Sequence, residues 1–244
     1  MSGSASLILA YHSVDTSGSV ISTSPQTFRE QMKFLAGSGL RVAPLAEVQQ
    51  TPGAVALTFD DGFLNFFEHA FPALQEHDFP ATVFVVAGYC GGRNDWPSQW
   101  PGIPKLELMT WGQLQEIARH GVALGGHTVN HPPLTSLPME QIETELRECR
   151  AVIEDRTGHA AEAFAYPYGD SNENVRACTA RHFSLACGTS LAYLSPQSSR
   201  FDLPRLDAFY LQKRCWFERL ATPAGRAYIA LRRRLREWRQ LVTR

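Results

Sequence analysis

The chain has 244 residues, of which 44% are hydrophobic and 19% charged, and its formal net charge is −1. This composition is that of an ordinary globular protein. The length suits one domain, since α/β barrels often reach about 250 residues as a single unit. No stretch approaches the roughly 20 apolar residues of a membrane-spanning helix, and the charge does not indicate a nucleic-acid-binding protein.

Short apolar segments rich in β-forming residues alternate with longer amphipathic segments along the chain. Ser24 followed by Pro25 marks the start of a first helix, Thr110 and Gln113 form a capping box for a third, and Gly158 ends a fourth. Helices are predicted at residues 25–37, 63–77, 111–120, 139–157 and 173–182. Strands are predicted at residues 7–11, 55–59, 82–86, 122–125, 163–166, 184–186 and 203–206.

This alternation predicts a parallel sheet whose strands are joined by helical crossovers. Near-continuous apolar strands fit a sheet that is covered on both faces. About seven such units favour a barrel over an open sheet. The predicted fold class is therefore α/β, a (β/α) barrel of about seven strands in residues 1–220.

Residues 221–244 differ in charge from the rest of the chain, because they contain seven arginines and one acid and carry +6 while the remainder carries −7. Apolar residues recur in this segment at three- and four-residue spacing, which predicts a basic amphipathic helix. One interpretation is a helix packed on the barrel with a solvated basic side; the other is peripheral membrane contact through residues 224–244. The apolar positions are Tyr228, Leu231, Leu235, Trp238 and Val242.

The five cysteines are odd in number and form no Cys-x-x-Cys pair, so neither a disulfide framework nor a zinc knuckle is indicated. Reduced thiols suit the cytosol. Residues 1–6 lack the basic start of a signal peptide, and the apolar run at residues 7–10 is too short for its core. We therefore expect a cytoplasmic protein, peripheral on the inner membrane if the C-terminal helix binds lipid.

The first candidate site is an apolar strand that ends in Asp60, Asp61 and Gly62. Active sites of barrels and α/β sheets lie at the ends of strands. Successive strand residues point to opposite sides, so one carboxylate can bind a metal while the other stays free as a base. The competing interpretation is a turn in which an aspartate caps the next helix.

A second candidate is the pair His127 and His131, which follows the predicted strand at residues 122–125. Two histidines four residues apart can share one side of a helical turn and bind one ion, although the flanking glycines and prolines place them at a strand end, on a loop or on a short turn. An incidental pair is the alternative. One carboxylate with two imidazoles leaves a position open for water, as in catalytic zinc sites.

Three further features have both a functional and an ordinary interpretation. The turn around Tyr168 could present a backbone N–H to an oxyanion or be a plain turn. His12 follows a predicted strand and, on the residues alone, is better explained as a core histidine. Residues 88–105, which include Trp96 and Trp100, predict a long surface loop of the kind that is often functional.

Together, Thr58-Phe59-Asp60-Asp61-Gly62 and His127-Thr128-Val129-Asn130-His131 resemble the first two motifs of the polysaccharide deacetylases, also called the NodB-homology or carbohydrate esterase family four enzymes. Both motifs are specific, and the resemblance covers about residues 7–207. It implies a distorted (β/α) barrel and a divalent metal, zinc first, with cobalt or nickel as alternatives. It also implies that Asp61, His127 and His131 hold the metal, Asp60 is the general base, Tyr168 supplies a backbone donor to the oxyanion, and Thr128 steadies the histidine loop.

The sequence departs from the family pattern at two places. Ala165 stands where the third motif has an arginine that orients the base, and no histidine follows His182 to give the C-terminal Leu-x-His acid. The poly-N-acetylglucosamine deacetylases form a subgroup with a permuted arrangement and a Tyr-His near the N-terminus, which Tyr11-His12 is similar to. That resemblance implies His12 as the general acid. Separately, Arg205, which follows Pro204, is a candidate substitute for the missing arginine.

The function that follows from the resemblance is hydrolytic N-deacetylation of an N-acetylated carbohydrate, with no nucleic-acid partner. Glycoside hydrolysis is a competing enzyme class, but it needs carboxylates about 5–10 Å apart across a bond, and adjacent Asp60 and Asp61 suit it poorly. A sugar-binding pseudoenzyme is the alternative outside enzymes. Ala165 and the missing C-terminal motif favour it, whereas the intact metal and base residues oppose it.

Overall fold

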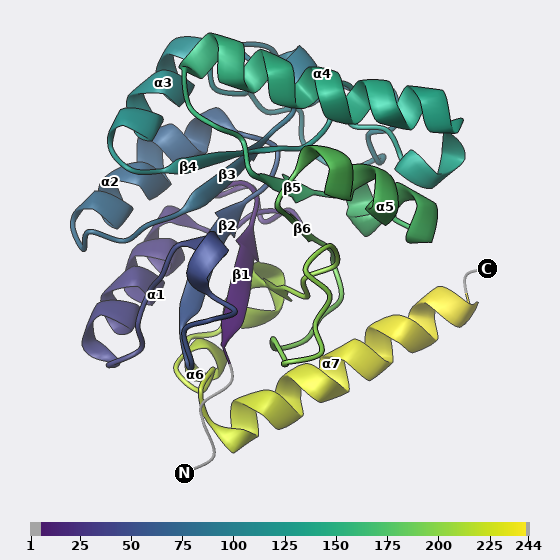
Figure 1. Cartoon of the computed structure of the whole chain (residues 1–244). Coiled ribbons are helices and arrows are strands. Elements are labelled where there is room, and N and C mark those ends of the chain that lie inside the picture. The colour runs from purple at the N-terminus through teal and green to yellow at the C-terminus, as the bar shows by residue number, and fades with distance from the viewer. Residues whose placement is uncertain (1–5, 243–244) are drawn as a thin grey trace.

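Seven parallel strands form one curled sheet at the centre of the molecule (Figure 1). The computed structural model describes residues 6–242, and the side chains of residues 240–242, among them the predicted apolar position Val242, lie outside the description. The strand order is β6-β5-β4-β3-β2-β1-β7. The strands are β1 (Leu7–Tyr11), β2 (Val55–Phe59), β3 (Thr82–Val85), β4 (Ala123–Gly126), β5 (Ala163–Ala165), β6 (Leu185–Cys187) and β7 (Leu206–Asp207).

The sheet curls far enough for its two edges to approach one another. Leu203 pairs with Cys187 of β6, and Leu206 pairs with Leu9 of β1, so residues 203–207 connect both edges. The predicted fold, a distorted (β/α) barrel of about seven strands, is confirmed. The last strand differs from the prediction because Pro204 has no N–H for a continuous ladder, and regular pairing to β1 starts only at Leu206.

The helices predicted outside the barrel are present, and they cover it in Figure 1. Ser24 accepts the Thr27 N–H at the start of α1, both bonds of the Thr110–Gln113 capping box form at α3, and Gly158 ends α4 with a φ of 72°. Every residue of β1 and β2 is buried, as expected of strands between a packed interior and a helical layer. The helices are α1 (Pro25–Gly37), α3 (Trp111–Arg119), α4 (Met139–Thr157) and α5 (Glu173–His182).

The helix predicted at residues 63–77 is irregular. It contains a π-helical segment, Phe66–Ala70, which leads into the short α2, Phe71–Gln75. Pro72 has no N–H to donate to the carbonyl four residues earlier, and its ring would collide with that carbonyl. The Phe71 N–H instead bonds the Phe66 carbonyl, five residues back, which widens the turn.

Two helices close the chain, α6 (Arg214–Phe217) and α7 (Pro223–Val242). In the part of the chain that the structure describes, five 3₁₀ segments lie between the other elements, at Leu45–Glu47, Ala87–Tyr89, Leu134–Ser136, Pro167–Gly169 and Ala208–Leu211. Within residues 6–242, no helix combines the length and the apolar character needed to cross a membrane. The division into a barrel up to residue 220 and a separate C-terminal helix stays a prediction.

Candidate active site

The side chains of Asp61, His127 and His131 converge on one point. Asp61 Oδ1 lies 3.4 Å from His127 Nε2 and 3.3 Å from His131 Nε2, and the two Nε2 atoms are 3.2 Å apart. All three residues are buried. Ligands bound to zinc at about 2.0–2.1 Å in a tetrahedron lie about 3.3 Å from one another. The three atoms are therefore spaced as three corners of such a site.

The hydrogen bonds of His127 define which ring nitrogen faces this point. His127 Nδ1 lies 2.7 Å from the Ala165 carbonyl oxygen and must donate to it, so Nε2, which is directed at Asp61, is the nitrogen that can lose its proton and bind a cation. His131 Nε2 faces both Asp61 Oδ1 and His127 Nε2, and its single proton can be donated to only one of them. A cation bound by all three residues resolves this, and the donor set of one carboxylate and two imidazoles suits a divalent transition metal.

Burial alone would raise the pKa of Asp61, but hydrogen bonds from His127 and His131 outweigh it and hold the pKa far below its usual range. The same carboxylate raises the pKa of His127 above its ordinary value despite burial, which lowers it. Burial dominates at His131 and lowers its pKa. Asp61 thus stays ionised well below the pH at which an ordinary carboxyl is protonated, and a carboxylate must be ionised to bind a metal.

The two histidines lie on a tight loop after β4 rather than on a helical turn. Thr128 and His131 have φ angles of 68° and 54°, a left-handed conformation that L-residues rarely adopt. The Thr128 hydroxyl donates to the His127 carbonyl and accepts the His131 N–H at 2.8 Å. Glu145 of α4 accepts the N–H groups of Val129 and Asn130 at 2.7 and 3.0 Å. These bonds stabilise the strained loop.

Replacing Glu145 by alanine is expected to weaken metal binding, because the loop that orients both histidines loses two backbone partners. Groups that orient metal ligands typically contribute about 10–100-fold to affinity. Competition titration against a chelator measures this change directly. Glu148→Ala, an exposed glutamate on the same helix, is the control, and equal affinities of the two variants would contradict the role given to Glu145.

Asp60 faces a different partner from Asp61. Its carboxylate receives two parallel bonds from Arg205, at 2.6 and 2.8 Å, and both side chains are buried. Arg205 is itself held by the Gly188 carbonyl at 3.0 Å. Burial alone would raise the pKa of Asp60, but Arg205 and then His12 outweigh it and lower the pKa. The structure thus places Arg205 where a residue that orients the base would lie.

The strand register explains why His12 lies near Asp60. Tyr11 pairs with Phe59 at the ends of β1 and β2, and the Asp60 N–H continues this ladder by donating to the Tyr11 carbonyl at 2.9 Å. His12 Nε2 therefore lies 3.7 Å from Asp60 Oδ2, with the side chain 28% exposed. His12 is partly open to solvent and borders the cavity, so the core-histidine interpretation is wrong.

A cavity of about 400 Å³ opens above these residues and is walled by aromatic side chains. Tyr168 has a φ of 60°, and its hydroxyl donates to the Ser98 carbonyl at 2.8 Å. Trp96 stacks on His131 with ring centroids 4.2 Å apart, and Trp100 lies parallel to Tyr168 at 6.1 Å. The cavity can therefore hold the face of a sugar ring against an aromatic wall, with its substituents directed at the carboxylates and histidines.

A family model described as polysaccharide deacetylase matches residues 47–182, more than half of the chain. The chain belongs to the polysaccharide deacetylase family. The match includes both the Asp60–Asp61 and the His127–His131 motifs and ends before Arg205. Assignment to the permuted subgroup stays a prediction.

Curated members of the polysaccharide deacetylase family are similar to part of the chain. The putative polysaccharide deacetylase YxkH of Bacillus subtilis is 25% identical over 176 residues, 69% of this chain and 58% of that protein. The peptidoglycan-N-acetylglucosamine deacetylase of Bacillus cereus is 30% identical over 121 residues, which are 49% of this chain and 38% of that protein. The chain thus spans between about two fifths and three fifths of the length of these relatives.

Solved structures of other proteins share the fold over most of its length. IcaB from Ammonifex degensii superposes with a TM-score of 0.73 at 26% identity, covering 88% of this chain and 98% of that one. The Streptococcus pyogenes deacetylase PplD, solved with acetate, gives a TM-score of 0.72 at 23% identity, covering 84% and 93%. The second likeness concerns the fold alone.

Sequence reasoning missed some residues at this site. Arg236 of α7 borders the cavity, with its guanidinium donating to the Thr189 carbonyl at 3.0 Å, and Phe209 lies on the rim. Nothing in the arginine-rich segment distinguishes Arg236 from its neighbours except its position on the helix face. The sequence did indicate Trp96 and Trp100, because they lie in the loop at residues 88–105 that was predicted to be functional.

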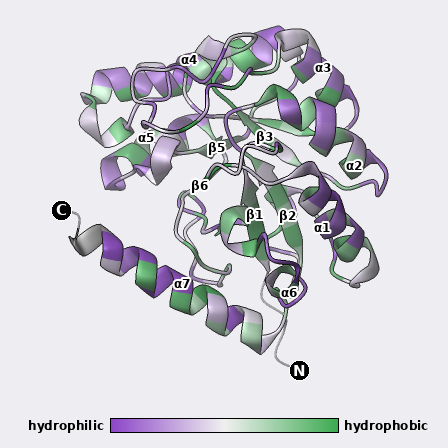
Figure 2. Cartoon of the chain, turned by 180° about the vertical axis from the view of Figure 1, so that it is seen from behind, coloured by the Kyte–Doolittle hydropathy of each residue, from purple (hydrophilic) through white to green (hydrophobic). Residues whose placement is uncertain are grey.

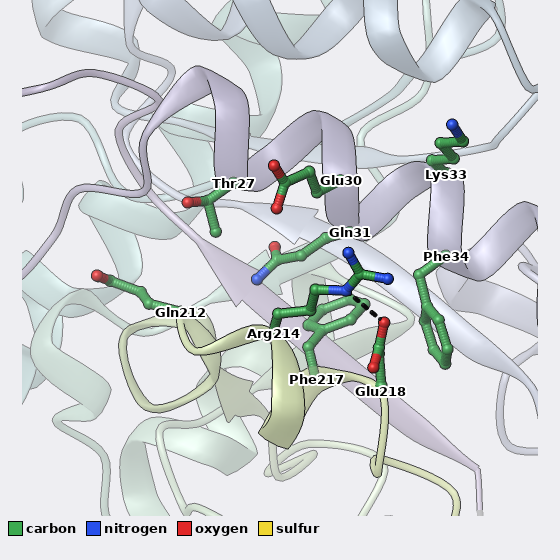
Figure 3. Close-up of a pocket in the computed structure, with 9 residues that line it drawn as sticks. All are labelled: Thr27, Glu30, Gln31, Lys33, Phe34, Gln212, Arg214, Phe217 and Glu218. Carbon is green, nitrogen blue, oxygen red and sulfur yellow. Dashed lines mark hydrogen bonds and ion pairs between the residues drawn. The ribbon is translucent and has the colours of Figure 1, made fainter.

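A second cluster of polar residues and a second groove lie elsewhere on the molecule. Glu143, Cys178 and His182 lie close enough to ligate an ion, but the Arg181 guanidinium already pairs with Glu143, and the group links α4 to α5. A groove of about 460 Å³ lies between α1 and α6 (Figure 3). Its lining contains no histidine or cysteine, and its Arg214–Glu218 pair at 2.6 Å is a surface ion pair. Neither feature combines buried ligand atoms with an open cavity, as the Asp61, His127 and His131 site does.

Proposed function

We propose that this chain is a metal-dependent N-deacetylase that hydrolyses the acetamido group of an N-acetylated sugar to acetate and a free amine. The observation that carries the proposal is the convergence of Asp61, His127 and His131 at the floor of a cavity, with the Arg205-bound Asp60 beside them. Membership of the polysaccharide deacetylase family supports it. The sugar belongs to a polysaccharide, a lipid-linked oligosaccharide or a glycoside.

Asp61, His127 and His131 would hold the metal, which we propose is zinc, with cobalt or nickel as alternatives. When bound there, a divalent cation supplies Lewis-acid polarisation of the acetyl carbonyl and a more acidic water. Asp60 is the general base: it takes a proton from the attacking water, and Arg205 keeps its carboxylate ionised and oriented. The backbone N–H of Tyr168 donates to the oxyanion of the tetrahedral intermediate.

His12 is proposed as the general acid that protonates the leaving amine nitrogen as the C–N bond breaks. It is partly exposed at the cavity, 3.7 Å from Asp60, so the two groups that exchange protons with the reaction adjoin one another. This arrangement supports the permuted interpretation, in which the acid comes from the N-terminal strand. Arg205, which binds Asp60, would replace the missing motif arginine, and His12 would replace the missing C-terminal histidine. These two replacements count against a pseudoenzyme.

Replacing His12 by alanine is expected to lower kcat about 10²–10⁴-fold, the usual contribution of one acid–base group, while bound metal is unchanged. Steady-state acetate release and elemental analysis of the same preparation measure the two quantities. His159→Ala, an exposed histidine after α4, is the control. Full activity in His12→Ala would contradict the assignment of the acid.

Chelator-sensitive acetate release from a panel of substrates tests the proposal as a whole. The panel contains N-acetylglucosamine oligomers, a lipid-linked N-acetylated sugar and a small glycoside, each with added zinc, cobalt or nickel. Release from at least one substrate, lost on chelation and restored by metal, is the expected result. Sugar binding without acetate release under every condition would favour the pseudoenzyme. The cytoplasmic location stays a prediction, which fractionation of the native host tests.

A further inference from the structure

Helix α7 exposes an apolar stripe to solvent. Leu231, Leu235 and Trp238 are 56%, 43% and 63% exposed. Successive residues of an α-helix are about 100° apart, so these three lie within about 60° of one another on the helix surface. Seven large apolar side chains are exposed in the described part of the chain, and three of them form this stripe.

The stripe is not the face that packs on the barrel. Ile229 is 2% exposed, and Tyr228 stacks on Trp216 with ring centroids 4.1 Å apart. Arg236, on the same inward side, reaches the Thr189 carbonyl. In Figures 1 and 2 α7 runs along the outer edge of the molecule, and Figure 2 shows hydrophobic bands between hydrophilic ones along it. The barrel therefore does not cover Leu231, Leu235 and Trp238, and another partner is needed to bury them.

Arginines lie on both sides of the stripe. At 100° per residue, Arg234 is on one side and Arg239 is on the other, whereas Arg232 packs its guanidinium over the Tyr210 ring. The segment 221–244 carries +6. A symmetric contact between two copies of α7 would bring two such charges together, which is unfavourable. An anionic lipid surface instead supplies both the apolar layer for the stripe and the negative charge for the arginines.

We infer that α7 lies on an anionic membrane surface, with Leu231, Leu235 and Trp238 inserted at the level of the lipid headgroups. Three of the remaining exposed apolar side chains, Val20, Trp100 and Phe209, border the catalytic cavity, which α7 itself reaches through Arg236. The inference goes beyond the proposed N-deacetylation and does not depend on it.

Co-sedimentation of the full chain with vesicles tests the inference. One set of vesicles contains phosphatidylcholine and phosphatidylglycerol in equal parts, and the other contains phosphatidylcholine alone. We expect binding to the anionic vesicles that weakens as salt is raised, and little binding to the neutral ones. The variant Leu231→Ser/Leu235→Ser/Trp238→Ser should lose this binding, whereas Met139→Ser, which changes an exposed apolar residue of α4, should keep it.

A second variant isolates the charge. Each arginine near an anionic surface contributes about fivefold to binding at about 1 kcal/mol, so Arg234→Gln/Arg239→Gln should weaken vesicle binding about 10–30-fold. The matched control is Arg93→Gln/Arg147→Gln, which removes two exposed arginines elsewhere. Thermal melts check that all variants fold.

Two outcomes would overturn the inference. One is equal vesicle binding by the chain and its stripe variant. The other is a dimer in light scattering that the stripe variant converts to a monomer without any lipid binding, which would assign the stripe to a second copy. Acetate release is not part of either readout, so a failure here is distinct from a failure of the proposed N-deacetylation.

Discussion

Asp61→Ala is expected to abolish both bound metal and acetate release, whereas Asp60→Asn is expected to keep the metal and lose about 10²–10⁴-fold in kcat/KM. The two aspartates are neighbours in the sequence, but the chain directs them at different partners. Asp61 Oδ1 lies within 3.4 Å of two histidine nitrogens, while Asp60 is bound by Arg205. Elemental analysis of each purified variant, together with steady-state kinetics, separates the two roles.

Asp155→Ala, an exposed aspartate on α4, is the control for nonspecific loss of metal. If Asp60→Asn and Asp61→Ala lost metal equally, the assignment of Asp61 as metal ligand and of Asp60 as base would be wrong. If Asp60→Asn kept full activity, the proton would have to be taken by another group of the cavity.

Arg205→Ala is expected to have the second largest effect, because it leaves the buried Asp60 carboxylate without its cation. Removing one partner of a buried ion pair usually costs about 3–5 kcal/mol of unfolding free energy. The variant should also change the pH dependence of catalysis. Arg205 helps to hold the pKa of Asp60 below its usual value against burial, which raises it. Without the arginine the pKa rises, the base is protonated up to a higher pH, and the acid limb of kcat/KM moves upward.

Denaturant unfolding measures the first effect, and a pH–rate profile below the unfolding temperature measures the second. Arg205→Lys restores the charge without two parallel hydrogen bonds, so its acid limb should lie between those of the native chain and Arg205→Ala. A loss of stability with an unmoved acid limb would show that Arg205 only supports the fold.

Most of the fold follows from local pattern. Strands buried on both faces read as continuous apolar runs, and helix ends carry chemical signals such as the Thr110–Gln113 capping box. The deviations came from two prolines. Pro72 widens the second predicted helix into a π-helical segment, and Pro204 interrupts the last strand where it passes from one edge of the sheet to the other. The effect of Pro72 is local, because the carbonyl four residues earlier is known from the sequence. The effect of Pro204 depends on which strand lies opposite it, and sequence alone does not give that pairing.

Some residues of the candidate site also follow from local sequence pattern, and others do not. Asp60, Asp61, His127 and His131 lie within short motifs that carry their chemistry in the spacing, and the structure brings them together as predicted. Arg205 is 145 residues from Asp60 in the chain. The sequence offered Arg205 only as a candidate substitute for the missing arginine, and its contact with Asp60 depends on the curl of the sheet, which brings the start of β7 to the interior beside the end of β2. His12 was read from the residues as a core histidine, and the β1–β2 register places it beside Asp60 instead.

The most direct test of the central claim is a titration of metal-free protein with zinc, with acetate release from a substrate of the panel followed at each step. Activity should be near zero without metal, rise linearly and level off at about one zinc per chain, since one buried set of three ligands is proposed to serve catalysis. His127→Ala should not respond at the same zinc concentrations. Undiminished acetate release by the metal-free chain, or an unchanged titration in His127→Ala, would contradict the claim.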